Sequence, residues 1–138
     1  MPLADIRALY EQKGRDIFDD SWVDNLKDLG NLAGAQYSNK ALSRELRRMF
    51  GDARLKDLNK RVIVPAFDLD NEKPDASRRS WAPKFFHNFP GPDSDGDRLA
   101  YKVALYTSAA PTFFPSVDGY MDGGVSANNP SMAALVQT

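Results

Sequence analysis

Cysteine is absent from the chain, and histidine occurs only once, at His87. Without cysteine there is no disulfide scaffold, no thiolate zinc site and no cysteine nucleophile. Neither sign of charge is in excess, because 18 basic residues stand against 19 acidic ones and the net charge is −1. Such a balance gives no field that attracts a polyanion, so we expect no nucleic-acid partner.

Long apolar runs are also missing. No segment approaches the roughly 20 apolar residues of a membrane-spanning helix, and the first ten residues lack the charged and then apolar layout of a signal peptide. We therefore expect a soluble protein, cytoplasmic or peripheral to a membrane. A length of 138 residues with 42% hydrophobic content predicts one domain, or part of one, with a buried core.

Helical spacing of apolar residues is present near the start of the chain and again after Ser38. Pro2 suits the first position of a helix whose pattern ends at Gly14. Residues 15–37 read as a loop with a helical turn or two. Ser38 is placed to cap a second helix that Gly51 ends. The apolar face of that helix consists of Leu42, Leu46, Met49 and Phe50.

Strand signals follow. Residues 61–68 form a β-branched run with little alternation, which is typical of a central, largely parallel strand covered on both faces, although Pro65 counts against it. The aromatic segment 84–89 predicts another short strand. Residues 120–122 read as the end of a third strand.

Helices are expected between and after these strands. Asp95 or Asp97 can cap a helix over residues 98–109 that Pro111 ends, and Asn128-Asn129-Pro130 begins a last helix. Alternation of strands with helices predicts an α/β fold.

The segment most informative about chemistry is Asp122-Gly123-Gly124, because it follows a predicted strand. Open α/β sheets build their sites at strand ends of this kind. The glycines allow positive φ and let a substrate or another backbone approach the carboxylate. The same letters also make an ordinary turn, since Asp-Gly and Gly-Gly are common turn dipeptides.

The longer string TSAAPTFFP, then DGG, then ANNP resembles the patatin-like phospholipase family in order and spacing. The resemblance continues upstream through FGDARLKDLNKRVIVPAFDLDN and PLADIRALYEQKGRDIF, so it covers essentially the whole chain. It implies a three-layer α/β/α sandwich with a mainly parallel sheet, present here only in part. It also implies a Ser-Asp dyad whose aspartate is Asp122, with Gly123, Gly124, Asn128, Asn129 and Pro130 shaping the loop around it.

The resemblance implies that the chain is part of a serine lipid acyl hydrolase that cleaves acyl esters of lipids, and that it supplies the general base, Asp122. The partner that this implies is a lipid or acyl-ester substrate, which can lie at a membrane surface. Two family motifs are missing, the Gly-rich oxyanion loop and the Gly-x-Ser-x-Gly elbow that carries the nucleophile. We therefore expect residues 1–138 to be a partial domain truncated at both ends, inactive without the missing N-terminal half. The alternative is a catalytically inactive remnant or interaction module.

Two serines, the single histidine and three aspartates could be catalytic or metal-binding residues, but simpler structural roles explain them. Ser126 lies between small residues but lacks the spacing of an elbow, so it reads as a loop serine, and Ser108 reads as structural. His87 precedes Asp122, whereas α/β-hydrolases place their histidine after the aspartate, so we interpret it as a packed strand residue. The aspartates at 93, 95 and 97 alternate like the first ligands of a calcium-binding loop, but the residues at the later positions of such a loop do not match its pattern. No cofactor and no metal site is predicted.

Two further sets of residues have both a functional and an ordinary reading. Basic residues on the second predicted helix could meet lipid phosphates or simply be solvated; they are Lys40, Arg44, Arg47 and Arg48. Aromatic residues could line an acyl path or belong to the core; they are Tyr10, Trp22, Phe113 and Phe114.

Overall fold

The structure is a computed structural model that describes residues 7, 9–14, 17 and 37–136. Most of the first predicted helix and most of residues 15–37, with Trp22, lie outside the described residues. A π-helical turn covers Leu9–Lys13. The main elements are α4 (Asn39–Phe50), β1 (Ile63–Asp68), β2 (Ala82–His87), α5 (Ala100–Thr107), β3 (Tyr120–Asp122) and α6 (Ser131–Val136). Of the helices within these ranges, none is long and apolar enough to cross a bilayer.

The three strands form one sheet in the order β2-β1-β3. β1 pairs antiparallel with both neighbours, with Val64 opposite Phe86 and Ala66 opposite Asp122. β2 and β3 therefore run in the same direction on either side of β1. α5 connects them, so this part of the chain is a parallel strand–helix–strand unit with an antiparallel strand in its middle. The strands and helices together confirm the α/β class.

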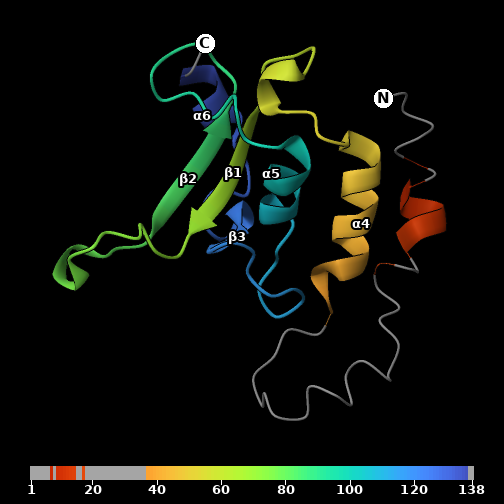
Figure 1. Cartoon of the computed structure of the whole chain (residues 1–138), viewed down its shortest axis with the longest axis horizontal. Helices are drawn as coiled ribbons and strands as arrows, with labels where there is room; N and C mark the ends of the chain where they lie inside the picture. Colours follow the sequence, from red (N-terminus) through yellow and green to blue (C-terminus); the bar gives the residue numbers. More distant parts are fainter. Residues whose placement is uncertain (1–6, 8, 15–16, 18–36, 137–138) are drawn as a thin grey trace.

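The expected mainly parallel pairing is wrong for the strands that the structure describes. A continuous apolar run indicates that both faces of a strand are covered, but it carries no information about direction. Direction follows from the connections. A parallel neighbour needs a crossover, usually a helix, whereas β1 and β2 are joined by a loop that leaves and returns at the same end of the sheet (Figure 1).

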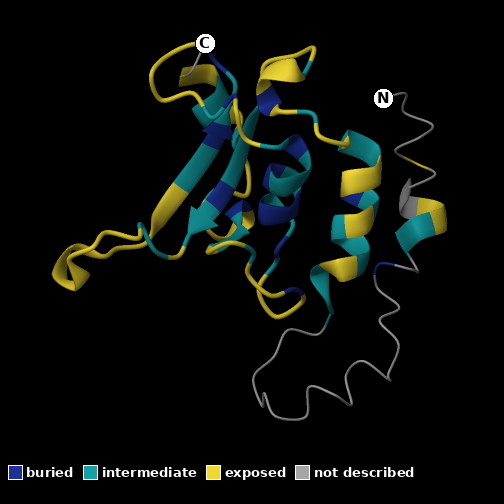
Figure 2. Ribbon diagram, viewed as in Figure 1, coloured by how far each residue is buried: buried dark blue, intermediate teal, exposed yellow. Residues whose placement is uncertain are grey.

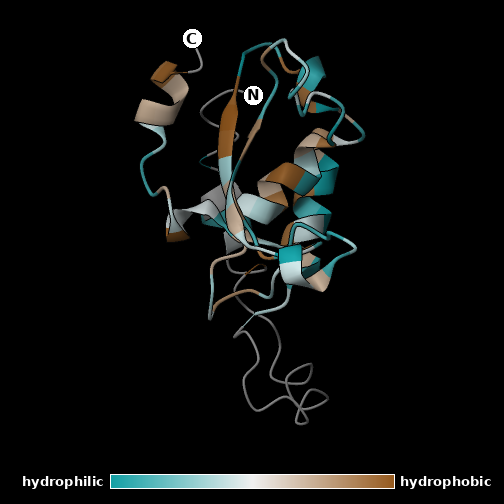
Figure 3. Ribbon diagram, turned by 90° about the vertical axis from the view of Figure 1, so that its left-hand side faces the viewer, coloured by the Kyte–Doolittle hydropathy of each residue, from teal (hydrophilic) through white to brown (hydrophobic). Residues whose placement is uncertain are grey.

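Helices lie on both sides of this sheet. α5 packs against β1 and β3 on one side, and α4 packs on the outer side of α5 (Figure 1). Figure 3 shows α6 on the opposite side of the sheet, with strongly hydrophobic residues at its end. Three of them are exposed, namely Met132, Leu135 and Val136. A partial three-layer arrangement is thus present.

The core lies between the sheet and α5. Phe86 of β2 is completely buried, and Ala66 of β1 packs with it against Val103 and Tyr106 of α5. Figure 2 shows buried residues on α5, within β1 and near the end of β2. α5 buries four of its eight residues, whereas α4 buries only Leu46. α5 is therefore the helix that determines where the strands sit.

The predicted boundaries of α4 are confirmed. The Ser38 side chain accepts a hydrogen bond from the Lys40 amide at 3.1 Å, and Gly51 follows the helix with a φ of 54°. Most residues avoid such a φ, so glycine is the natural residue at this helix end.

The predicted cap of α5 is wrong. Leu99 occupies the N-cap position and makes no side-chain cap bond. Asp97 instead forms an ion pair with Lys56 at 2.6 Å, and Asp95 forms one with Lys84 at 2.9 Å. Both carboxylates are committed to lysines before the helix begins, so neither can cap it.

The strand boundaries shift slightly from the prediction. β2 ends at His87, and Asn88 uses its side chain to join two segments. Its Oδ1 accepts from the Val62 amide at 2.7 Å, and its Nδ2 donates to the carbonyl of Leu55 at 2.8 Å. Pro65 lies inside β1, one residue beyond the end of the pairing with β3.

We predict that Phe86→Ala lowers the free energy of unfolding by about 3–5 kcal/mol, because it opens a cavity in the centre of the core. Phe85→Ala, the matched substitution at the neighbouring half-buried position of β2, should cost clearly less. Urea denaturation followed by circular dichroism measures both. Equal losses at the two positions would mean that the core does not lie on the α5 side of the sheet.

Candidate functional site

Asp122 is the last residue of β3, as predicted, and it is half-buried. Its amide donates to the carbonyl of Ala109 at 3.0 Å, just after the end of α5. Its partner across the sheet is Ala66 in the middle of the core. The backbone of Asp122 is thus fixed between β1 and the end of α5.

The Asp122 carboxylate holds the turn that follows it. Oδ1 accepts a hydrogen bond from the Gly124 amide at 2.7 Å, which caps a 3-10 turn over Gly123–Val125. The amides of Ser126 and Ala127 both donate to the Gly123 carbonyl, at 3.0 and 2.7 Å. Within the described part of the chain, Oδ2 of Asp122 takes part in no hydrogen bond or ion pair. One oxygen is therefore fixed, and the other is available.

Gly123 is needed for close packing and not for an unusual φ. A Cβ placed on Gly123 would lie 2.3 Å from the carbonyl carbon of Pro65 and 2.4 Å from its oxygen. Neither Gly123 nor Gly124 uses the positive φ that glycine allows. The backbone that comes close is that of Pro65, and it approaches Gly123. The turn after β3 lies directly on β1, and only glycine fits there.

The Asn128-Asn129-Pro130 segment leads from this turn into α6. Asn129 Oδ1 accepts from the amide of Ser131 at 3.1 Å and from its hydroxyl at 2.6 Å, so it caps the helix. A Cβ added to Gly124 would lie 3.2 Å from Asp122 Oδ1 and 3.6 Å from Asn128 Oδ1. Asn128 and Asp122 therefore flank Gly124, while Asn129 and Pro130 start the helix.

The TSAAPTFFP segment forms the turn between α5 and β3. The Ala110 carbonyl accepts from the amides of Phe113 and Phe114 at 3.1 and 2.9 Å, and Thr112 has a φ of 70°. Phe114 is buried, whereas Phe113 is 49% exposed and stacks on the Tyr37 ring at 6.5 Å between centroids. Phe114 is thus a core residue, and Phe113 retains an exposed face. The Tyr10 side chain lies outside the described residues.

The other serines and the histidine are placed as follows. Ser108 Oγ donates to the Ala104 carbonyl at 2.8 Å, which is a helical backbone contact. Ser126 is exposed at the end of the turn that Asp122 caps. His87 lies in β2 opposite Ile63. Its ring and that of Phe89 pack in a T-shaped arrangement with 5.8 Å between the ring centroids. The structure does not bring His87 to the sheet position of Asp122.

The remaining charged candidates have ordinary partners or face outward. In the described part of the chain, no three acidic or histidine side chains gather as metal ligands. On α4, Arg47 lies 5.9 Å from the centroid of the Tyr101 ring and Arg48 lies 3.9 Å from Glu45. Lys40 and Arg44 are exposed.

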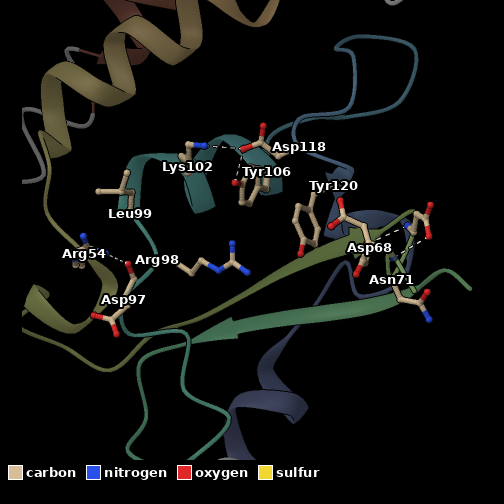
Figure 4. A pocket seen from close by; sticks show the side chains of 12 residues that line it. Arg54, Asp68, Asn71, Asp97, Arg98, Leu99, Lys102, Tyr106, Asp118 and Tyr120 are labelled. Carbon is tan, nitrogen blue, oxygen red and sulfur yellow. Dashed lines mark hydrogen bonds and ion pairs between the residues drawn. The ribbon is translucent and has the colours of Figure 1, made fainter. Parts of the chain in front are cut away.

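Sequence reasoning missed a cavity of about 480 Å³ beside the carboxyl end of β1 (Figure 4). We call it the tyrosine cavity; its wall includes Asp68, Arg98, Lys102, Tyr106, Asp118 and Tyr120. Asp118 and Gly119 have φ values of 49° and 82° and form a tight turn, closed by paired hydrogen bonds between Val117 and Tyr120. The Asp-Gly dipeptide was the available signal for this hairpin.

Hydrogen bonds and burial set the protonation of this wall. Asp118 Oδ2 accepts from Lys102 Nζ at 2.9 Å and from the Tyr106 hydroxyl at 2.7 Å. These two donors hold the pKa of Asp118 below its usual value. Burial, together with the bond to Asp118, raises the pKa of Tyr106, and burial with the charge of Asp68 raises the pKa of Tyr120. Both tyrosines are therefore hydroxyl donors at neutral pH.

Comparison with known proteins gives one family. The patatin-like phospholipases match residues 1–135. The chain is 28% identical over 149 residues to Patatin-like protein 1 of Oryza sativa subsp. indica, covering 97% of this chain and 34% of the relative. It is 32% identical over 146 residues to the cGAMP-activated phospholipase of Escherichia coli, covering 96% of this chain and 37% of the relative. The chain is also 35% identical over 109 residues to a cGAMP-activated phospholipase of Vibrio cholerae, covering 74% of this chain and 29% of the relative. The chain thus spans about a third of the length of these proteins.

We predict that Gly123→Ala destabilises the fold by about 1–3 kcal/mol or more, because its Cβ cannot fit against Pro65 without moving β3. Gly14→Ala is the matched control, since a Cβ there meets no described residue within 4 Å. Thermal and urea unfolding compare the two variants. A Gly123→Ala protein as stable as the control would show that the turn does not rest on β1.

Proposed function

The chain belongs to the patatin-like phospholipase family, and from this premise we propose that it is part of a serine lipid acyl hydrolase in which Asp122 is the general base. The substrate proposed is an acyl ester of a lipid. Residues 1–138 contain no Gly-x-Ser-x-Gly sequence. In this proposal the serine and the oxyanion-binding amides come from a segment outside them, since the relatives are about three times as long.

The observation that carries the proposal is the state of the Asp122 carboxylate. One oxygen is anchored by the Gly124 amide at 2.7 Å, and the other has no partner among the described residues. A general base needs this combination of a fixed orientation and an available oxygen within reach of the proton it removes. The backbone bond to Ala109 and the close contact of Gly123 with Pro65 hold the backbone of Asp122 in place, and the Gly124 amide holds its carboxylate.

The proposed reaction proceeds in two stages. The serine oxygen forms a bond to the ester carbonyl carbon while its proton passes to the free oxygen of Asp122. Collapse of the tetrahedral intermediate breaks the ester bond, and the leaving lipid alkoxide takes the proton from Asp122. Water then adds to the acyl-serine with Asp122 again as base, releasing the fatty acid and restoring the serine. No imidazole takes part, in keeping with the position of His87 in β2.

A negatively charged carboxylate is a weak base for a hydroxyl, so the proposal depends on its surroundings. The ordinary pKa of an aspartate is about 3.9. In the proposal, Asp122 acts through its fixed orientation: Gly124 anchors Oδ1, and Oδ2 lies within hydrogen-bond reach of the serine hydroxyl.

We predict that Asp122→Asn, in a protein that includes the nucleophile segment, keeps its fold and loses nearly all esterase turnover. The amide can still accept from Gly124 but cannot take the serine proton, and a positioned general base is worth roughly 10²–10⁴-fold in rate. Hydrolysis of a short-chain aryl ester provides kcat. Asp52→Asn, at an exposed position, is the matched control. Retention of more than about a tenth of kcat would remove Asp122 from the base role.

We also predict that residues 1–138 alone neither hydrolyse an aryl ester nor react with a serine-directed phosphonate. Mass spectrometry of peptides locates any adduct, and a Ser126→Ala chain is the control for the serine nearest the Asp122 turn. Activity should appear when the nucleophile segment of a family member is added in trans or by fusion. Stoichiometric labelling of Ser126 together with turnover would instead place the nucleophile within these residues. A well-folded fusion with no turnover would favour the inactive interaction module.

A further inference from the structure

The tyrosine cavity lies apart from the Asp122 carboxylate and has charges that the proposed reaction does not use. Its volume of about 480 Å³ falls within the roughly 300–1,000 Å³ usual for small-molecule sites. It is bounded by the segment before α5, by the first residues of β3 and by the loop that follows β1 (Figure 4).

Half of the charged residues in the cavity wall are already in ion pairs. Lys102 is paired with Asp118 at 2.9 Å, Asp97 with Lys56 at 2.6 Å, and Asp70 with Arg79 at 3.1 Å. Arg54 donates to the Asp97 carbonyl. The ion-paired groups are neutralised in place, and the Arg54 guanidinium is occupied by a backbone carbonyl, so these residues form the wall and do not call for a ligand.

Four charges have no ion-pair partner within the described ranges, namely those of Arg54, Arg98, Asp68 and Glu72, and of these the Arg54 guanidinium is bonded to the Asp97 carbonyl. Arg98 extends from the segment before α5 across the cavity toward Tyr120 and Asp68 (Figure 4). Its guanidinium donates no hydrogen bond to a described residue. Asp68 accepts only from the Asp70 amide, at 3.1 Å. An unpaired cation therefore stands opposite two unpaired carboxylates.

The aromatic wall adds polar and π-electron contacts. The Tyr120 ring lies 4.8 Å from the Tyr106 ring between centroids and exposes its hydroxyl end to the cavity (Figure 4). The Tyr106 hydroxyl is occupied by Asp118, but that of Tyr120 bonds to no described residue. A cation held near Asp68 would also meet the Tyr120 ring, which attracts it through the ring quadrupole.

We propose that the tyrosine cavity binds a small zwitterion of the phosphoethanolamine type, with its phosphate on Arg98 and its ammonium between Asp68, Glu72 and Tyr120. A simple anion would meet the repulsion of two carboxylates, and a simple cation would meet Arg98. A ligand with both charges satisfies all three groups. Guanidinium binds phosphate through two parallel hydrogen bonds, which fixes the orientation of the ligand.

The ligand could come from two sources with the same chemistry, a free phosphate–amine or the head group of a lipid. In the lipid case the inference rests on the proposed function, because Tyr120 is two residues before Asp122 in β3. At about 3.3 Å per residue, the head group would lie roughly 7 Å along the strand from the candidate base. In the free case the cavity is a separate binding site.

The first experiment titrates the chain with O-phosphoethanolamine by NMR and calorimetry, which requires no turnover. We expect saturable binding that shifts the ring signals of Tyr106 and Tyr120 more than those of His87. Inorganic phosphate alone and ethanolamine alone should each bind at least tenfold more weakly. Equal binding of phosphate alone, or shifts spread evenly over the chain, would overturn the proposal without any variant.

Variants then test the two ends of the ligand. Arg98→Gln and Asp68→Asn should each weaken binding by about tenfold or more, and Arg98→Lys should recover part of the loss. Arg44→Gln, an exposed position on α4, is the control and should bind normally. Unchanged affinity in either cavity variant, with an unfolding midpoint like that of the control, would contradict the assigned contacts.

Vesicles separate the two sources. Co-sedimentation with vesicles of phosphatidylethanolamine and phosphatidylcholine in equal parts, lost in Arg98→Gln and displaced by free O-phosphoethanolamine, would assign the cavity to a lipid head group. Binding of the free compound without such co-sedimentation would assign it to a free zwitterion. Vesicles of phosphatidylglycerol, which lack the ammonium, should not bind through Arg98. Esterase activity of the Asp122→Asn variant tests the proposed function separately, since that variant should still bind the zwitterion.

Discussion

The contact among the rings of Phe86, Tyr106 and Tyr120 holds this part of the molecule together. Phe86 lies 5.7 Å from Tyr106 and 5.2 Å from Tyr120 between ring centroids, and the two tyrosines lie 4.8 Å apart. Each ring comes from a different element, β2, α5 and β3. β3 is only three residues long, so its pairing with β1 alone would hold it weakly, and the aromatic contact supplies the rest.

Both candidate sites depend on that contact. Tyr120, at the start of β3, belongs to the rings and to the wall of the tyrosine cavity. Asp122, at the end of the same strand, carries the carboxylate that Gly124 anchors. The family match covers residues 1–135, so these features lie within a segment that the patatin-like phospholipases share. The rings, the cavity and the carboxylate are positioned by a single short strand.

Local chemistry explains which parts of this arrangement could be predicted. The ends of α4 at Ser38 and Gly51 could be predicted because capping depends on a few neighbouring residues. The two glycines after Asp122 likewise predicted that a strand ends there. Strand direction was not predictable, because the apolar run at 61–68 fits either direction. Asp97 failed as a cap because Lys56, distant in sequence, takes its carboxylate. The tyrosine cavity combines side chains from several segments, so no single pattern indicates it.

The bond from the Asp122 amide to the Ala109 carbonyl makes α5 and β3 mechanically continuous. α5 has eight residues, a length of about 12 Å at 1.5 Å per residue. Lys102 and the segment before the helix border the cavity at one end, and Ala109 follows the other end. The tyrosine cavity, whose wall includes Lys102 and Tyr106, therefore borders α5 along much of its length, and the Asp122 backbone is bonded just after its last residue. Because this bond joins the end of α5 to the last residue of β3, whatever occupies the cavity beside α5 also contacts the element that fixes the backbone of Asp122.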